Sequence, residues 1–138
     1  MARAGVAIFG AGRMGQGLAL ALQRSGWPVL LVSRTLHAVA APLRLHPGGR
    51  AAAVRESSAV LLAVPDRAVA EVAAELAAEG AVEARHVVLH LSGLLDRGAL
   101  APLASTGAGL GSFHPLQTVS EPATAADQLR GAYAGIEG

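Results

Sequence analysis

Short apolar runs alternate along this chain with longer segments in which apolar residues recur at helical spacing. Residues 5–9 and 28–32 form continuous apolar runs, a pattern typical of strands buried on both faces of a parallel sheet. Between them, residues 12–25 have the spacing of an amphipathic helix, and Gly26 is expected to end it. Strands that alternate with helices predict an α/β protein with a doubly wound, mostly parallel sheet and helices on both faces.

The same criteria predict five further strands, at residues 50–54, 58–64, 86–91, 109–113 and 132–136. They also predict helices at residues 36–45, 66–80, 94–104 and 123–129, the first interrupted by Pro42. Asp66 is expected to cap the second of these helices. No helix is predicted to follow the last strand, which leaves a sheet edge or face for another element to cover.

The first strand leads into the glycine-rich turn Gly10-Ala11-Gly12-Arg13-Met14-Gly15. In a dinucleotide-binding strand–turn–helix unit, the first glycine permits the tight turn and the second lets a pyrophosphate approach the backbone. The third lets the helix pack closely on the strand. The helix N-terminus then offers unpaired N–H groups to the phosphates. The alternative is an ordinary turn in a chain rich in Ala and Gly.

The second strand ends in Ser33-Arg34-Thr35, and no acidic residue precedes Glu56. Domains that bind NAD usually place an acidic residue here to hold the ribose hydroxyls. A guanidinium instead matches a 2′-phosphate in charge and in the geometry of its donors. We therefore expect NADP(H) as cofactor; the alternative is a solvated Arg34 at a strand end.

Further polar groups follow the later strands, whose carboxyl ends converge on the ligand-binding edge of such a sheet. Val64 and Pro65 are expected to contact the cofactor. Ser92 and His114 are the candidate catalytic residues, because an imidazole suits proton transfer near neutral pH and a hydroxyl can hold the same substrate oxygen. Gln117 is a candidate for orienting the substrate or the nicotinamide. Alternatively, Ser92 forms a turn and His114 fixes its own loop.

The other histidines have structural or surface roles in this interpretation. His90 is expected to be hydrogen-bonded within a strand, His86 to lie far from the binding edge, and His37 and His46 to lie on the surface. No spacing of histidine and carboxylate residues indicates a metal site. Three glutamates at i,i+4 spacing indicate a solvated helix face: Glu71, Glu75 and Glu79.

The composition of the chain limits the class of protein, its partners and the chemistry that it can perform. The 138 residues suit one domain, 52% of them are hydrophobic and 15% are charged. No apolar run reaches the ~20 residues of a membrane span, and no signal peptide is indicated, so we expect a cytoplasmic protein without membrane contact. The net charge of +1 with scattered arginines does not favour nucleic-acid binding. The absence of Cys and Lys excludes disulfides and Schiff-base chemistry.

Four motifs occur together in one order: the Gly10–Gly15 turn, Val64-Pro65-Asp66, His90-Leu91-Ser92-Gly93 and Ser112-Phe113-His114-Pro115-Leu116-Gln117. In these motifs, and in its closing residues 131–138, the chain resembles the N-terminal domain of the Rossmann-like NADP oxidoreductases that carry a helical C-terminal domain of unknown function. It is more distantly similar to pyrroline-5-carboxylate reductase, prephenate dehydrogenase and the 3-hydroxyacid dehydrogenases.

This resemblance implies a Rossmann fold over residues 1–138, NADP(H), a homodimer, and a small-molecule substrate bound between this domain and a helical one. It implies that Ser92 and His114 lie beside the nicotinamide. The helical domain is absent from the chain, so a non-catalytic dinucleotide-binding or dimerisation module is the alternative. A narrower option, prephenate dehydrogenase-like activity, would require a pair of arginines for two carboxylates, and no such pair is evident.

Overall fold

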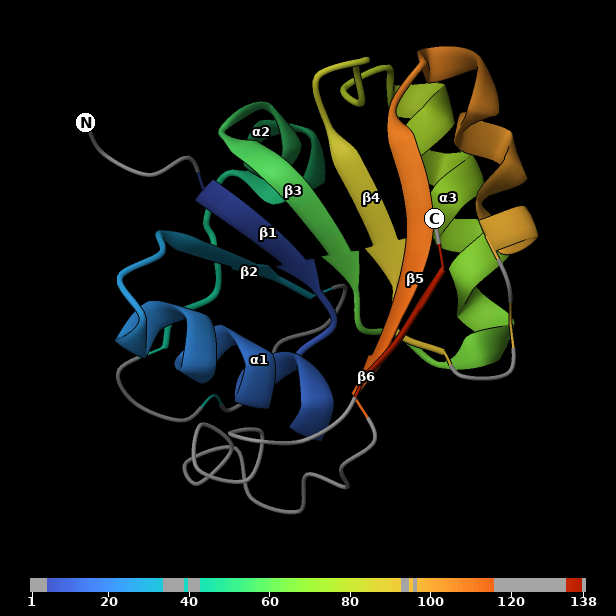
Figure 1. Cartoon of the computed structure of the whole chain (residues 1–138). Coiled ribbons are helices and arrows are strands. Elements are labelled where there is room, and N and C mark those ends of the chain that lie inside the picture. The colour runs from blue at the N-terminus through green and yellow to red at the C-terminus, as the bar shows by residue number, and fades with distance from the viewer. Residues whose placement is uncertain are drawn as a thin grey trace.

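The computed structural model describes residues 5–33, 39, 43–92, 95, 97–115 and 134–137, with the backbone alone at 97, 114, 115 and 134–137. Its strands form one sheet in the order β2-β1-β3-β4-β5-β6 (Figure 1). The first five strands pair in parallel, and β6 runs antiparallel to β5. The strands are β1 (Gly5–Phe9), β2 (Val29–Val32), β3 (Ser57–Leu62), β4 (Val87–His90), β5 (Gly109–Pro115) and β6 (Ala134–Glu137). The predicted mostly parallel, doubly wound sheet is therefore confirmed.

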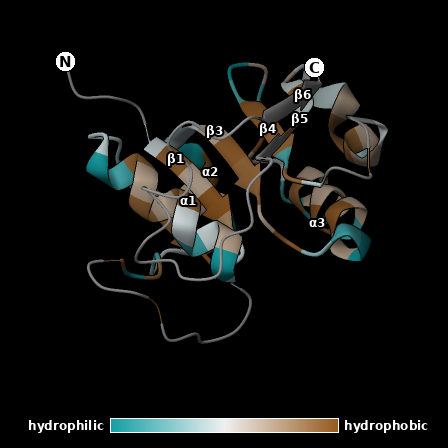
Figure 2. Ribbon diagram, turned by 60° about the horizontal axis from the view of Figure 1, so that its bottom comes forward, coloured by the Kyte–Doolittle hydropathy of each residue, from teal (hydrophilic) through white to brown (hydrophobic). Residues whose placement is uncertain are grey.

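Described helices cover both faces of this sheet. Helix α1 (Arg13–Arg24) packs with β1 and β2 in one apolar cluster. On the opposite face, a second cluster joins the strands to α2 (Gly49–Arg55), α3 (Asp66–Glu79) and the 3₁₀ helix η1 (Arg97–Thr106). Figure 2 shows that the strands are mainly hydrophobic, whereas α1 and α3 carry both hydrophilic and hydrophobic residues. None of the described helices has the length and apolar character needed to cross a membrane.

The central strands and α3 form the core, as the spacing of their apolar residues predicted. All five residues of β1 are buried, because the strand lies between β2 and β3 and is covered on both faces. In α3 the apolar residues Val69, Val72 and Leu76 recur at helical spacing and are buried against the sheet. Gly80 adopts a left-handed conformation with φ of +69° and ends the helix.

The predicted strand at residues 50–54 is wrong: these residues belong to α2. A run of five residues is too short for periodicity to separate a strand from a helix. Alanine has the highest helix propensity of any residue, and the three alanines at 51–53 lie in α2, in agreement with that propensity. The sheet consequently has one strand fewer among the described residues than the sequence predicted.

Other boundaries differ in detail. Residues 97–106 form a 3₁₀ helix, where a helix at 94–104 was predicted. Leu45 pairs with Leu31 in an isolated parallel bridge, so the end of the predicted helix 36–45 is not helical. Asp66 is the first residue of α3, whose N-cap position is Pro65 without a side-chain cap. Residues 36–38 and 40–42 and the predicted helix 123–129 lie outside the described residues.

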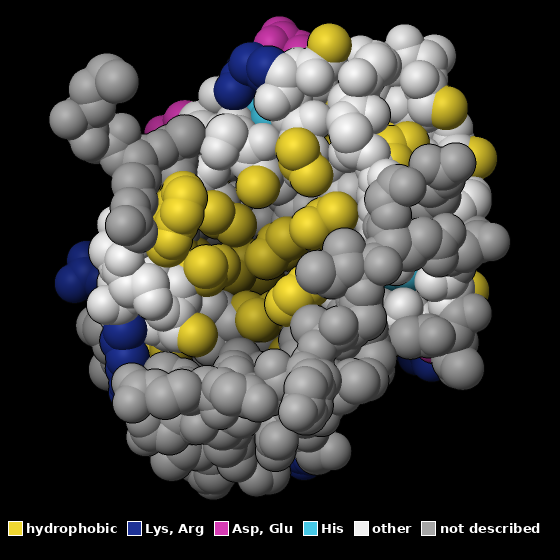
Figure 3. Space-filling model, in the orientation of Figure 1, with side chains coloured by type: hydrophobic (Ala, Val, Ile, Leu, Met, Phe, Trp, Pro, Cys, Tyr) yellow, Lys and Arg dark blue, Asp and Glu magenta, His cyan; other side chains and the backbone are white. Residues whose placement is uncertain are grey.

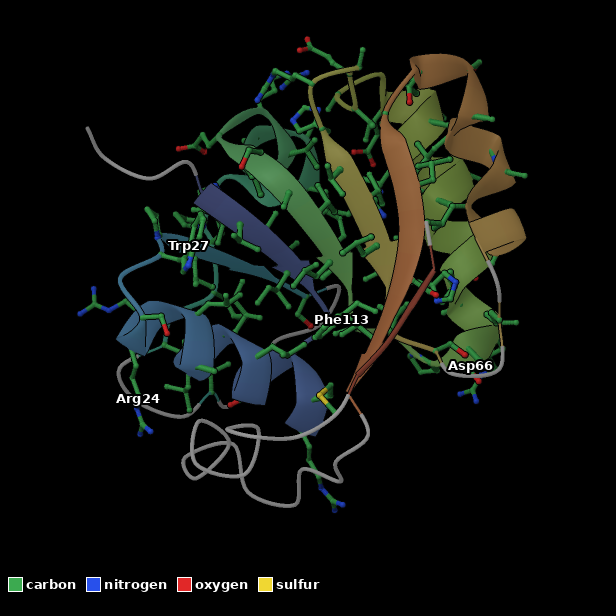
Figure 4. The ribbon with its side chains drawn as sticks, viewed as in Figure 1. Arg24, Trp27, Asp66 and Phe113 are labelled. Atoms are coloured by element: carbon green, nitrogen blue, oxygen red, sulfur yellow. The ribbon has the colours of Figure 1, made fainter. Side chains whose placement is uncertain are left out.

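Hydrophobic side chains gather in a shallow hollow on the face of the molecule seen in Figure 3. On the α1 side of the sheet, the apolar cluster includes the partly buried Leu61, Leu91 and Phe113. Figure 4 shows Phe113 near the middle of the molecule, on β5. Val87 of β4 is 43% exposed. Of the described helices, α1 alone contributes to this cluster.

Candidate functional site

The glycine-rich turn lies between β1 and α1 and is tightly enclosed by backbone. Gly10 has φ of +111°, and a Cβ atom there would lie 2.2 Å from the carbonyl oxygen of Ala63. A Cβ atom on Gly15 would lie 2.0 Å from the carbonyl oxygen of Gly10. Both positions therefore require glycine, the first for its backbone conformation and the second for the close packing of α1 on the turn.

The second glycine of the turn, Gly12, is not crowded by described backbone atoms as Gly10 and Gly15 are. Its φ is −79°, it occupies the N-cap position of α1, and a Cβ atom there would meet no described atom within 4 Å. No side chain in the described part of the chain caps α1, so its first N–H groups are not occupied by a described cap. The Gln16 side chain donates a 2.7 Å hydrogen bond to the Ala11 carbonyl oxygen and holds the turn in this shape. An open glycine before uncapped N–H groups fits the pyrophosphate of a dinucleotide.

A cleft of about 600 Å³ opens beside this turn, at the carboxyl ends of β1, β2 and β3. Six of the predicted cofactor residues line it: Gly10, Ala11, Gly12, Ser33, Val64 and Pro65. The rest of the lining is mainly apolar and comes from the strand ends and α3: Phe9, Val32, Ala63, Arg67, Ala68 and Val72, with Arg50 of α2. The cleft thus offers an apolar wall for a flat ring beside a polar turn.

Three described residues among the other predicted cofactor residues do not line this cleft. Arg13 is exposed in the first turn of α1, Met14 packs against the α1-side cluster, and Gly15 is buried beneath the turn. Arg34 and Thr35 lie outside the described residues. Ser33 is the described residue of the predicted ribose-binding segment, and it lines the cleft.

Two arginines of the cleft were missed by sequence reasoning. Arg67 directly follows the Val64-Pro65-Asp66 motif, and its position next to the predicted contacts Val64 and Pro65 was the signal that could have identified it. Figure 4 shows Asp66 at the start of α3. Arg50 carried no signal, because its segment was predicted to be a strand. In the structure, Arg50 donates hydrogen bonds to Glu75 and Glu79 of α3.

The glutamate row of α3 is therefore only in part a solvated face. Glu71 is exposed, whereas the side chains of Glu75 and Glu79 are 33% and 27% exposed and pair with Arg50. The hydrogen bond from Arg50 to Glu75 is the main cause that raises the pKa of the guanidinium. Arg50 is held as a permanent cation at the cleft wall.

Of the two candidate catalytic residues, Ser92 follows β4, and His114 lies within the adjacent strand β5, near its carboxyl end. His90 pairs in register with Ser112, so Ser92 and His114 are each two residues beyond paired positions at the same edge of the sheet. Ser92 is 7% exposed, and its hydroxyl oxygen accepts a 3.2 Å hydrogen bond from the Leu95 N–H. The side chain of His114 lies outside the described atoms. Ser92 does not line the described cleft.

The remaining described histidines are largely structural. His90 is fully buried, and its Nδ1 accepts a 3.2 Å hydrogen bond from the Ser92 N–H. His86 is buried with both ring nitrogens in hydrogen bonds. The His46 side chain is only 14% exposed, so its prediction as a surface residue is wrong. His37 lies outside the described residues, and among the described ones no group of three potential ligands could hold a metal ion.

Together, the strand order and the glycine turn define the class of doubly wound α/β domains with a phosphate-binding type of turn after the first strand. Residues 1–115 match the Rossmann-like domain family, and the chain belongs to this family. A comparison with curated protein sequences finds no match.

Solved structures of reductases and a dehydrogenase share this fold. The imine reductase of Myxococcus stipitatus in complex with NADP+ matches with a TM-score of 0.64 at 22% identity, over 87% of this chain and 43% of that chain. A variant of it in complex with NAD+ matches with a TM-score of 0.65 at 20% identity, over 88% and 43% of the two chains.

Arogenate dehydrogenase from Synechocystis matches with a TM-score of 0.65 at 16% identity, over 83% of this chain and 42% of that one. Pyrroline carboxylate reductase from Plasmodium falciparum, with NADP bound, matches with a TM-score of 0.65 at 13% identity, over 99% and 47%. The chain thus spans less than half the length of these proteins. Its similarity to pyrroline carboxylate reductase is confirmed at the level of the fold, and the neighbours include complexes with NAD+ and with NADP.

Proposed function

We propose that this chain is the NADP(H)-binding domain of an oxidoreductase that transfers hydride between the nicotinamide and a small-molecule substrate. The observation that carries the proposal is the contrast within the glycine-rich turn. Gly10 and Gly15 are closed by backbone atoms, whereas Gly12 opens toward a cleft in front of uncapped helix N–H groups. An ordinary turn would not require this combination.

In this proposal, different residues bind the pyrophosphate, the ribose and the adenosine of the cofactor. Gly12 and the N-terminus of α1 hold the pyrophosphate. Ser33, Arg34 and Thr35 hold the ribose and its 2′-phosphate. The apolar wall that includes Val64 and Pro65 receives the adenosine. Fold neighbours solved with NADP+ and NAD+ support a nicotinamide dinucleotide as the ligand.

When bound, the cofactor supplies the hydride chemistry. In the proposed site His114 holds or moves a proton at the substrate's oxygen or nitrogen, and Ser92 orients that atom. The substrate then lies between this domain and a helical domain, in a homodimer. This part of the proposal rests on the resemblance of the His-x-Ser-Gly and His-Pro-Leu-Gln motifs and on the larger size of the structural neighbours.

A non-catalytic dinucleotide-binding module is the second candidate. The hydrogen bond that the Ser92 hydroxyl oxygen accepts from the Leu95 N–H favours it, because this bond is that of a turn-forming serine. Hydride transfer from NADPH to an imine or a 2-oxo acid, or from a hydroxy acid to NADP+, would exclude this candidate.

Calorimetric titration of the purified chain with NADPH and with NADH tests the proposed cofactor. We expect tighter binding of NADPH, and we expect Arg34→Ala to weaken NADPH about tenfold or more with little effect on NADH, because a charge-assisted contact is lost. Arg24→Ala is the control, since Arg24 lies at the opposite end of α1 from the turn (Figure 4). Equal losses for both dinucleotides would overturn the role of Arg34.

A further inference from the structure

Arg50 is oriented by two carboxylates at the wall of the cleft. Its terminal nitrogens donate one hydrogen bond each, to Glu75 and Glu79 of α3. A guanidinium has five N–H donors in a fixed plane, so three remain after these bonds with described residues. The side chain is 29% exposed, which leaves it in contact with whatever enters the cleft.

A second pocket, of about 520 Å³, adjoins the cleft at this arginine. The two cavities share Val32, Ser33 and Arg50. Glu75 lines only the second pocket, and Glu79 lines neither. A ligand that enters from the cleft therefore meets the guanidinium of Arg50 before it meets either carboxylate.

The position of Ser33 indicates which part of a ligand would reach this junction. In doubly wound folds the adenosine ribose lies at the carboxyl end of the second strand, and Ser33 directly follows β2. A group on the ribose 2′ position would then point toward the space between Ser33 and Arg50. A preoriented guanidinium fits a phosphate monoester there, because its planar donors match the phosphate oxygens.

We propose that Arg50 is a specificity-determining residue that binds the 2′-phosphate of the cofactor's adenosine ribose, with Glu75 and Glu79 as the groups that orient it. This inference rests on the proposed function. It adds a residue from α2, outside the Ser33-Arg34-Thr35 segment. In this arrangement the guanidinium would contact the phosphate directly, whereas the two carboxylates are partly exposed to water, which weakens their repulsion of the phosphate.

Fragments of the cofactor isolate this contact from the nicotinamide half of the site. The affinities of wild type and Arg50→Met for 2′,5′-ADP and 5′-AMP are measured by calorimetry, with NADPH and NADH in parallel. We expect wild type to prefer 2′,5′-ADP, and Arg50→Met to reduce that preference about tenfold or more. Arg55→Met is the matched control, because Arg55 is an exposed arginine of the same helix that does not line the cleft.

The folded state of each variant is checked by circular dichroism and melting temperature. If Arg50→Met unfolds at the assay temperature, Arg50→Lys replaces it; this variant keeps the charge but loses the planar fork, so a smaller loss of preference is expected. A preference within about threefold of wild type in the variant that folds overturns the inference, and the proposed function stands. Equal binding of the two fragments by wild type also overturns it. Binding of none of the four ligands rejects both proposals.

Discussion

At the scale of single residues, the three glycines of the turn have different physical reasons to be glycine. Gly10 needs its positive φ, and Gly15 needs the absence of a side chain against the Gly10 carbonyl. Among the described residues nothing requires glycine at position 12 for folding, since its φ is −79° and a Cβ atom there would meet no described atom within 4 Å. A glycine that the fold does not require, next to a cleft, points to a ligand that approaches the backbone.

This difference predicts opposite results for two similar substitutions. Gly15→Ala should destabilise the fold by about 1–3 kcal/mol, because the new methyl group would overlap the Gly10 carbonyl oxygen. Gly12→Ala should leave the melting temperature nearly unchanged but weaken NADPH binding about tenfold or more, because the methyl group occupies the place of the pyrophosphate. Thermal unfolding and calorimetry measure both effects. Unchanged NADPH affinity in Gly12→Ala would place the pyrophosphate elsewhere.

At the scale of elements, His86 ties the start of β4 to α2, two segments that are distant in the sequence. It directly precedes β4, its Nδ1 accepts a 2.9 Å hydrogen bond from the Glu83 N–H, and its Nε2 donates a 2.9 Å bond to the Val54 carbonyl oxygen in α2. His86 is 1% exposed, so its ring nitrogens have little access to water. His86 thereby fixes the end of α2, and with it the helix that carries Arg50.

Replacing His86 with Leu keeps a side chain of moderate size but leaves the partly buried Glu83 N–H without its acceptor, and the Val54 carbonyl oxygen keeps its bond from the Ser57 hydroxyl. We expect a loss of about 1–3 kcal/mol in the free energy of unfolding, measured by urea denaturation. Val87→Ala is the control: the neighbouring Val87 is 43% exposed, and a loss below about 1 kcal/mol is expected. A comparable loss in both variants would mean that the hydrogen bonds of His86 contribute little.

At the scale of the whole molecule, the candidate cleft is assembled from segments far apart in the chain. The ends of β1, β2 and β3 form it together with residues of α2 and α3. A ligand that contacts all of these segments binds only the folded chain, so its binding free energy adds to the stability of the domain.

We therefore expect NADPH to raise the melting temperature. At a concentration of 100 times the dissociation constant, the gain is about 2.7 kcal/mol, which for a chain of this size corresponds to a rise of roughly 10 °C. Scanning calorimetry with NADPH, and with NADH at the same concentration as the comparison, measures this shift. A melting temperature that stays constant while NADPH is bound would show that the ligand does not select the folded domain.

The sequence by itself determined those features whose signals are local. The apolar runs of β1 to β4 and the helical spacing in α3 are recognisable because burial on both faces and a 3.6-residue period leave distinct patterns. The glycine-rich turn is equally local, since each glycine acts within a few residues of the others. These signals were sufficient for the fold class and for six of the residues that line the cleft.

Tertiary structure alone decided the rest. The five residues predicted as a strand became part of α2, because a segment that short takes its conformation partly from its partners. Arg50 acquires its orientation from Glu75 and Glu79, which lie 25 and 29 residues further along the chain. No local pattern encodes such a distance. The physical reason is that a guanidinium becomes a binding group only where folding supplies the carboxylates that orient it and the cavity that it faces.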